Sequence, residues 1–198
     1  MPLLKKCFMF VAFLFLGCGL SEDEVLEEIH KAKENGATEL NLNYSSISDL
    51  TPLTGLKDLK RLSLFENKIN DIAPLAKLVN LSDLSIFGNQ ITNVSPLTGL
   101  KKMEELDLSF NDIADISPLT GLKKLKGLDL GNNEITDVSP LVGLSQLKRL
   151  SLSGNRVTNI SPLAGLTELE WLSLDGNPTS EGQRAMLKKA LPNCDILF

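Results

Sequence analysis

LSLFENKINDIAPL, residues 62–75, is the stretch that decides the fold, because the chain repeats its pattern at a fixed distance. Leucines equivalent to Leu62 recur at steps of 22 residues: Leu40, Leu84, Leu106, Leu128, Leu150 and Leu172. Asparagine recurs in the same register as Asn67, Asn89, Asn111, Asn133, Asn155 and Asn177, and only the first copy departs, with Ser45. Copies in register at such a period are typical of a solenoid.

Each copy joins a strand pattern to a pattern that suits a tight turn. Leu62 and Leu64 are two residues apart, so an extended strand points both toward one face. From Ile69 onward the apolar residues are three apart, which suits a short 3₁₀ segment. Pro74, which recurs in five other copies, fixes φ and cannot extend a ladder of backbone hydrogen bonds. Strands on one side and tight turns on the other predict a curved body.

The recurring asparagines are expected to be structural. Asn67 follows the strand at a turn, where stacking of the copies places it beside the backbone of a neighbouring copy. A buried amide both donates and accepts hydrogen bonds and must be satisfied. We therefore expect the asparagines to form a hydrogen-bonded ladder. A row of ligand-binding amides is the alternative, and the presence of the same residue in almost every copy argues against it.

The full repeat, Leu-x-x-Leu-x-Leu-x-x-Asn-x-Ile-x-x-Ile-x-Pro-Leu-x-x-Leu-x-x, covers residues 37–177 in seven copies. It resembles the 22-residue leucine-rich repeats of internalins and of the phosphatase-regulator subfamily. The resemblance implies an α/β solenoid: a right-handed leucine-rich-repeat coil with a curved parallel sheet on its concave side, short 3₁₀ segments on its convex side and a helical cap at each end.

Residues 1–17 do not fit the repeat and are predicted to be a signal peptide. Lys5 and Lys6 give a positive start, an apolar run covers residues 8–16, and Cys18 follows. The run is too short for a membrane-spanning helix, which needs about 20 residues. The segment resembles a bacterial lipoprotein signal, which implies lipid attachment and membrane anchoring at Cys18. Simple secretion and an uncleaved anchor are the alternatives, so the expected location is the cell envelope or the exterior.

Two caps are expected to flank the repeats, because the apolar ends of a repeat array must be covered. Residues 18–36 hold the lipid-anchor cysteine, a short linker and a helix that begins at a Ser21–Glu24 capping box. The predicted apolar side of this helix is Val25, Leu26, Ile29 and Ala32. Residues 178–198 are expected to form a second helix and a short closing strand that contains Ile196 and Phe198.

Composition argues against several classes of function. The net charge is -5, the pI is about 5.0 and no basic stripe stands out, so nucleic-acid binding is not expected. The chain has three cysteines and one histidine, so neither a disulfide framework nor a metal centre is expected, and Cys194 is predicted to be a buried free thiol. The sequence shows no cofactor motif, no nucleophile beside a base and no phosphate loop, so neither enzymatic activity nor a cofactor is expected.

The residues that vary between copies are expected to face solvent on the concave side of the sheet, where they are free to specify a ligand. The column before the middle leucine is Glu39, Arg61, Asp83, Glu105, Gly127, Arg149 and Trp171. The column between the leucines is Asn41, Ser63, Ser85, Asp107, Asp129, Ser151 and Ser173. The column after them is Asn43, Phe65, Phe87, Ser109, Gly131, Ser153 and Asp175.

Nine of these residues are the candidate ligand contacts: Arg61, Phe65, Asp83, Phe87, Glu105, Asp107, Asp129, Arg149 and Trp171. The two phenylalanines on neighbouring strands are typical interface anchors, or else a cross-strand pair that covers the sheet. The four carboxylates suit a basic partner, or else form a solvated charged face. A calcium site there is disfavoured, because calcium takes about six or more oxygen ligands.

Trp171, the only tryptophan, either contacts the ligand together with Arg149 or packs near the second cap. Phe110, one position after Ser109, is expected to serve packing. The favoured function is an exported, lipid-anchored scaffold that binds a protein partner through the concave face as a monomer. The alternative, which the second resemblance implies, is a cytoplasmic regulatory subunit of an enzyme such as a phosphatase.

Overall fold

The computed structural model describes residues 19–198, so the predicted signal peptide and Cys18 lie outside the described residues. Over this range the chain forms one sheet of eight parallel strands in sequential order. The strands are β1 (Glu39–Asn41), β2 (Arg61–Ser63), β3 (Asp83–Ser85), β4 (Glu105–Asp107), β5 (Gly127–Asp129), β6 (Arg149–Ser151), β7 (Trp171–Ser173) and β8 (Asp195–Leu197). The 3₁₀ helices between them are η1 (Thr51–Gly55), η2 (Ala73–Lys77), η3 (Ser95–Gly99), η4 (Ser117–Gly121), η5 (Ser139–Leu141) and η6 (Ser161–Gly165).

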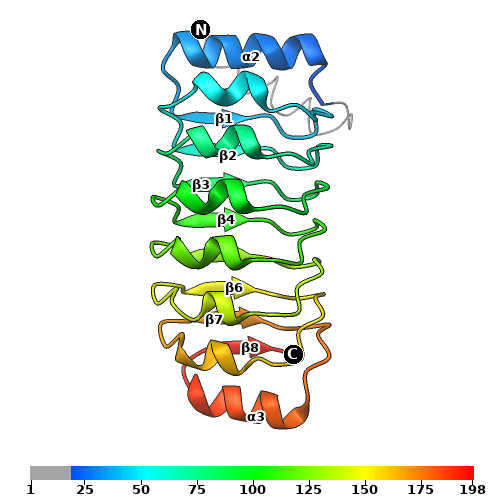
Figure 1. Ribbon diagram of the computed structural model, residues 1–198, viewed down its shortest axis with the longest axis vertical. Helices are drawn as coiled ribbons and strands as arrows, with labels where there is room; N and C mark the ends of the chain where they lie inside the picture. Colours follow the sequence, from blue (N-terminus) through cyan, green and yellow to red (C-terminus); the bar gives the residue numbers. More distant parts are fainter. Residues whose placement is uncertain (1–18) are drawn as a thin grey trace, which may run out of the picture.

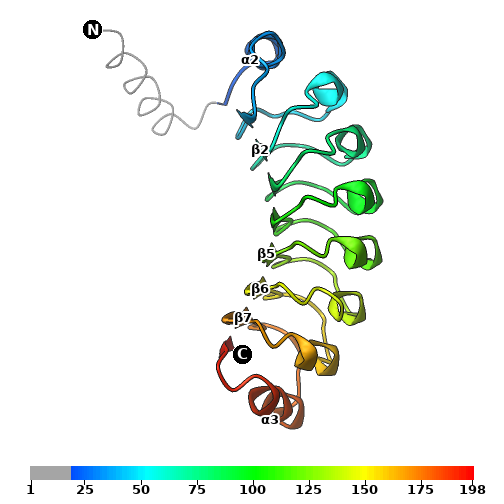
Figure 2. The same ribbon diagram turned by 90° about the vertical axis from the view of Figure 1, so that its left-hand side faces the viewer.

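The strands stack along the long axis of the molecule between the helices α2 (Glu22–Glu34) and α3 (Glu181–Ala190) (Figure 1). Figure 2 shows the strands on the inner side of a gently bent arc and the 3₁₀ helices on its outer side. Strands pack at about 4.8 Å, whereas helices need about 8–10 Å between axes, so the helical side is longer and the sheet becomes concave. The predicted α/β solenoid is confirmed.

The pairing register follows the sequence period. Leu62 pairs with Leu84 and Ser63 with Ser85, and every other pair from β1 to β7 likewise joins residues 22 positions apart. The leucines of neighbouring strands therefore stack into continuous buried rows, in which Leu64 and Leu75 of one coil are fully enclosed. Residues that vary between copies are aligned in the same way, so each column predicted from the sequence is a physical row across the sheet.

Each 3₁₀ helix begins with the same local arrangement. A proline stands in its first turn, and an Asp or Asn side chain accepts the backbone N–H two residues further on. In η2, Asp71 Oδ1 accepts from the Ala73 N–H at 2.8 Å. The equivalent acceptors are Asp49, Asn93, Asp115, Asp137 and Asn159. This bond satisfies an N–H that the start of a helix leaves without a partner.

The three-residue spacing does not define the extent of the 3₁₀ helix. Leu75 lies within η2, but Ile69 and Ile72, which share the spacing, precede it. Both are buried nonetheless. Proline fits only the first turn of a helix, so Pro74 fixes the start of η2 at Ala73.

The asparagine ladder predicted from the sequence is confirmed. Asn111 Nδ2 donates to the carbonyl oxygens of Ile86, Leu108 and Ser109 at 3.0–3.2 Å, and its Oδ1 accepts from the Ile91 N–H at 3.0 Å. Two of these partners, Ile86 and Ile91, belong to the preceding coil. Each asparagine thus joins its own coil to the one before it. The first copy has no preceding coil to serve, which explains why Ser45 is sufficient there.

The first cap, α2, has the predicted capping box. The Ser21 N–H donates to Glu24 Oε2 at 2.8 Å, and the Ser21 hydroxyl accepts from the Glu24 N–H at 3.4 Å. Val25, Ile29 and Ala32 are buried against the first coil. The prediction for Leu26 is wrong, because this side chain is 46% exposed. In an α-helix the residue directly after Val25 points about 100° away from it, and the first coil is too narrow to cover both directions.

The second cap also follows the prediction. Ser180 caps α3 by accepting from the Gln183 N–H, but the Gln183 side chain does not complete a capping box. Its Oε1 accepts from the Ile160 N–H at 3.0 Å and so ties the cap to the last repeats. The closing strand is β8. Cys194 is a free thiol as predicted, but it is only partly buried.

Neither α2 nor α3 has the length and apolar character needed to cross a bilayer, a finding that covers residues 19–198.

We expect Asn111→Ala to lower the free energy of unfolding by about 1–3 kcal/mol, because backbone groups of two coils lose their buried partner. Chemical denaturation measures this change. Asn70→Ala is the matched control: Asn70 is exposed and its equivalent in another copy is Ala114, so the control should leave stability unchanged. Equal effects of the two substitutions would contradict the ladder as the source of stability.

Candidate protein-binding face

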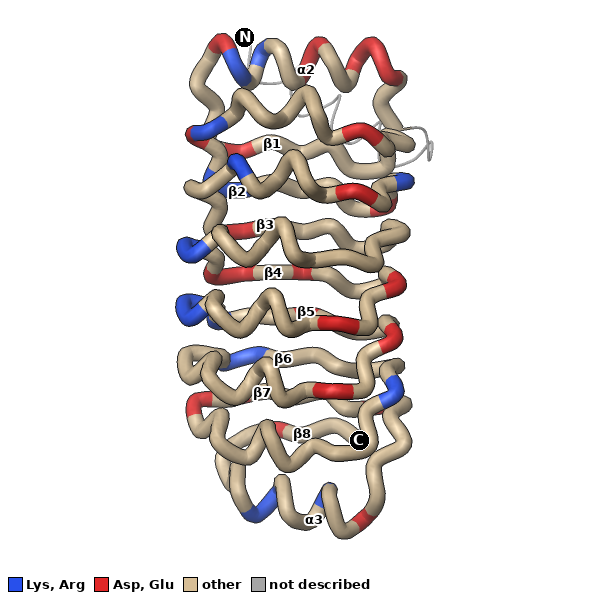
Figure 3. Tube along the Cα trace, in the orientation of Figure 1, with Lys and Arg blue, Asp and Glu red and all other residues tan. Residues whose placement is uncertain are grey.

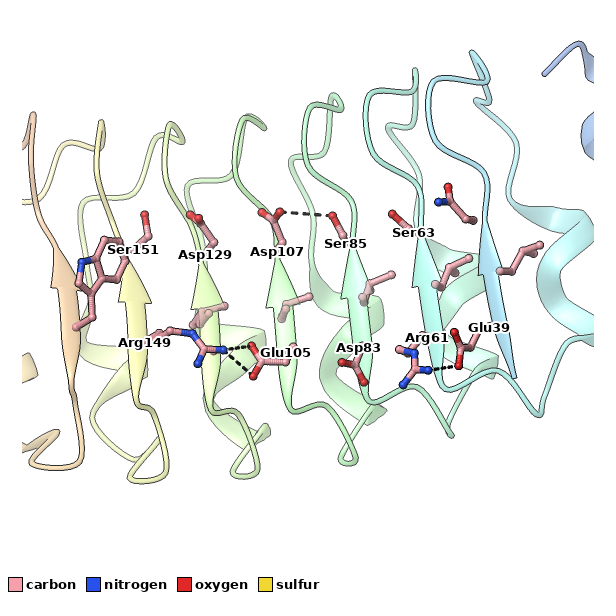
Figure 4. A pocket seen from close by; sticks show the side chains of 18 residues that line it. Glu39, Arg61, Ser63, Asp83, Ser85, Glu105, Asp107, Asp129, Arg149 and Ser151 are labelled. Carbon is pink, nitrogen blue, oxygen red and sulfur yellow. Dashed lines mark hydrogen bonds and ion pairs between the residues drawn. The ribbon is translucent and has the colours of Figure 1, made fainter. Parts of the chain in front are cut away.

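The concave side of the sheet holds a groove of about 650 Å³ that extends from β1 to β7. Side chains of the first two predicted columns line it (Figure 4). Seven of the nine candidate contacts lie in this groove: Arg61, Asp83, Glu105, Asp107, Asp129, Arg149 and Trp171. The structure therefore brings the charged candidates and the tryptophan together on one surface. Phe65 and Phe87 lie outside the groove.

Both arginines of the groove are held by carboxylates of the same face. Arg61 forms an ion pair with Glu39 on the neighbouring strand. The Arg149 guanidinium reaches across β5 and donates to both carboxylate oxygens of Glu105, at 3.0 Å each (Figure 4). Gly127 lies under this ion pair, and a Cβ there would come within 1.9 Å of a Glu105 oxygen. The missing side chain of Gly127 thus makes room for the pair.

Three carboxylates of the groove form no ion pair within residues 19–198: Asp83, Asp107 and Asp129. Asp107 and Asp129 face each other in register on β4 and β5. Each accepts the backbone N–H two residues further on, from Ser109 at 3.0 Å and from Gly131 at 2.8 Å. Because the arginines are already paired, the middle of the groove keeps an excess of negative charge.

Burial raises the pKa of the Asp129 carboxyl. The Gly131 N–H and the Ser151 side chain oppose this shift by hydrogen bonding to the charged form, and the neighbouring Asp107 charge adds to it. The groove therefore makes the charged form of Asp129 less favourable than it is in water. A cation from a binding partner would relieve both the burial and the repulsion.

The lysines do not neutralise the groove, because they lie elsewhere. Figure 3 shows basic segments gathered at the turns on one edge of the coil stack and acidic segments at the opposite edge. The basic edge consists of residues that lead into the strands: Lys57, Lys60, Lys101, Lys102, Lys123, Lys124, Lys126 and Lys148. Lys126 and Lys148 are paired there with Glu104 and Glu170.

Phe65 and Phe87 stack on each other beyond the ends of β2 and β3, with centroids 4.5 Å apart and planes at 19°. Tyr44 packs edge-on against Phe65 at 4.9 Å, and Phe110 packs against Phe87 at 4.8 Å. We call these four residues the aromatic rim. Both end rings are also open to solvent: Phe110 is 52% exposed and Tyr44 is 55% exposed.

The three columns predicted from the sequence do not contain Tyr44 or Phe110. Both residues come one position later in the repeat than the phenylalanines they touch. The sequence did contain a usable signal: each of four consecutive copies has one aromatic residue at one or the other of two adjacent repeat positions. Trp171 lies on β7 beside Arg149, where it lines the end of the groove and is half-buried.

A family model described as leucine-rich repeats in two copies matches residues 57–99, 79–118 and 101–143. Internalin C2 from Listeria monocytogenes is 31% identical, with a TM-score of 0.79, and the alignment covers 86% of this chain and 80% of that one. The chain belongs to the internalin-like leucine-rich-repeat proteins. No curated protein sequence matches this internalin-like chain.

Two further structures show the range of proteins with this fold. Internalin InlF from Listeria monocytogenes is 30% identical with a TM-score of 0.77, and the match covers 87% of this internalin-like chain and 54% of InlF. The plant peptide hormone receptor RGFR1, solved in complex with RGF2, is 29% identical with a TM-score of 0.63, covering 74% of this chain and 26% of the receptor. The leucine-rich-repeat scaffold is thus suited to protein–protein interaction.

We expect the Asp129 carboxyl to titrate at a higher pH than that of Asp137, where hydrogen bonds from Ser139 lower the pKa. Because the folded-state pKa of Asp129 is raised, the stability that this group contributes is complete below the unfolded-state pKa. That stability is lost as the pH rises through the folded-state pKa. Carboxyl ¹³C NMR titration measures both groups. Coincident titrations, or the reverse order, would contradict this account of the groove.

Proposed function

We propose that this protein is an exported, lipid-anchored scaffold that binds a protein partner through the concave face of its sheet and acts as a monomer. One observation carries the proposal: residues that vary from copy to copy converge on a single groove, while the repeated residues are used in packing. A surface of this kind can change its ligand without changing the fold. The complex of RGFR1 with RGF2 supports the use of the scaffold for binding a protein ligand.

The charge of the groove specifies the partner further. Asp83, Asp107 and Asp129 lack ion pairs within residues 19–198, so a complementary surface should present lysine or arginine side chains. Charge complementarity of this kind favours fast and selective association. The half-buried Trp171 at the β7 end offers an apolar contact in the same groove.

The proposal of export and anchoring rests on the predicted signal peptide. Lys5 and Lys6, the apolar run of residues 8–16 and the cysteine at position 18 support a lipoprotein signal. Attachment of acyl chains at Cys18 would hold the solenoid at a membrane surface by its first cap. The concave face would then remain accessible to partners along its whole length.

The binding face is tested by placing a photo-crosslinking amino acid at Ser63 in the groove, with Thr120 on the convex side as the matched position. In cells that express the protein naturally, we expect a discrete cross-linked partner from position 63 and none from position 120, because only the concave face is specialised. An adduct from position 120 alone would contradict the proposed face.

Lipid anchoring is tested by metabolic labelling with palmitate. We expect the wild-type chain to incorporate label and Cys18→Ser to lose it, because the lipid is attached through that thiol. Label that persists in Cys18→Ser would exclude this residue as the attachment site. An unlabelled wild-type chain retained in the cytoplasm would favour the regulatory-subunit alternative.

A further inference from the structure

We propose that the aromatic rim is a docking strip for an extended protein segment that carries both apolar and cationic side chains. This inference rests on the proposed function and adds to it, because it names a second surface, outside the groove, and the chemistry of the segment that covers it. The rim comprises Tyr44, Phe65, Phe87 and Phe110, one ring from each of four consecutive coils.

The rim is a continuous apolar strip. Successive ring centroids lie 4.5–4.9 Å apart, so no gap interrupts it. The two inner rings are half-buried, whereas the two end rings are more than half exposed. Beyond Phe110 the equivalent positions carry Asn132, Gly154 and Gly176, so the strip is confined to the first four coils.

The backbone argues that the end rings are not present for folding. Tyr44 and Phe110 have φ values of 57° and 54°, in the left-handed region that disfavours residues with a side chain. Of the other five coils, three have glycine at this position, which adopts this backbone freely, and two have the polar residues Glu66 and Asn132. An exposed aromatic side chain gains little burial in return. An unfavourable backbone that carries an exposed aromatic residue indicates a role in binding.

The stacking decides what the rim can contact. Phe65 and Phe87 stack on each other, so each of these inner rings has one face covered by the other and leaves its edges to a partner. Ring edges pack well against aliphatic side chains and aromatic faces. A cation or a sugar would need an open ring face. Because the strip crosses the coils at right angles to the strands, an extended segment lying along it can contact each ring in turn.

Nearby charge identifies the segment as cationic. Glu66 is exposed between the two phenylalanine coils, and its carboxylate lies over Gly88, where a Cβ would come within 2.9 Å of it. Asp107 and Asp129 line the neighbouring groove, Asp107 in the coil of Phe110 and Asp129 in the next coil. None of the three forms an ion pair within residues 19–198. An anionic lipid surface, or the acidic groove of a second copy, would be repelled here.

The test uses the full chain and a short synthetic peptide of alternating leucine and lysine, with binding measured by fluorescence anisotropy. Control peptides replace lysine with glutamate or leucine with serine.

We expect Tyr44→Gly and Phe110→Gly each to weaken binding about tenfold, the loss of one interface anchor. Both variants should melt at the same or a higher temperature, because glycine suits the left-handed backbone. Val142→Ser, which removes a 55% exposed apolar side chain on the convex side, should leave binding unchanged.

Several results would overturn the docking strip. Unchanged peptide binding in both glycine variants would exclude the rim, and equal binding of the glutamate peptide would exclude a cationic segment. Vesicles of neutral phosphatidylcholine that bind the wild type but not Phe110→Gly would assign the rim to a lipid surface. A dimer that Phe110→Gly converts to a monomer would assign it to a second copy. If the peptide binds at the rim but the crosslinker at position 63 yields no adduct, the proposed binding in the groove is wrong and the proposed docking strip still holds.

Discussion

The structure depends on one buried side-chain amide in each coil after the first. Each asparagine from Asn67 to Asn177 donates to a carbonyl of the preceding coil and accepts an N–H from it, so neighbouring coils are held at a fixed offset. That offset keeps the leucine rows continuous. It also keeps the variable columns in line, so residues far apart in the chain meet on one surface. Binding therefore depends on an interaction that takes no part in it.

The repeated residues are used in packing, so the concave face is left to the residues that vary between copies. The contacts among these residues decide the charge of the face. Arg61 and Arg149 are both paired within the face, so neither is free to attract an anionic partner. The carboxylates of Asp107 and Asp129 remain, one of them partly buried and beside the other. The groove is thus acidic, because its five carboxylates outnumber its two arginines and both arginines are held in ion pairs.

The aromatic rim is built partly at a position where the backbone restricts the choice of residue. The residue before each asparagine, or before Ser45 in the first coil, adopts a left-handed backbone in all seven coils, from Tyr44 to Gly176. Glycine meets that requirement in three of them, and bulky rings are placed there in two others. In those two coils the preceding position is polar, so the ring that completes the stack is supplied one residue later. Two different columns thus combine into one apolar strip.

The sequence by itself determined the solenoid, the asparagine ladder, the two caps and the columns of the concave face, because a strict period states which residues share an environment. It predicted nine contacts on the concave side, and seven of them line the groove of the structure. Tertiary structure alone decided the rest: the exposure of Leu26, the use of Gln183 to tie down the second cap, the reach of Arg149 over Gly127 and the entry of Tyr44 and Phe110 into the rim. Leu26 is exposed because the first coil covers only part of α2, and the other three features share a different reason. A period gives the direction of each side chain from its own coil. These three features depend instead on the sign of the backbone angle φ and on side chains that reach into a neighbouring coil or beyond.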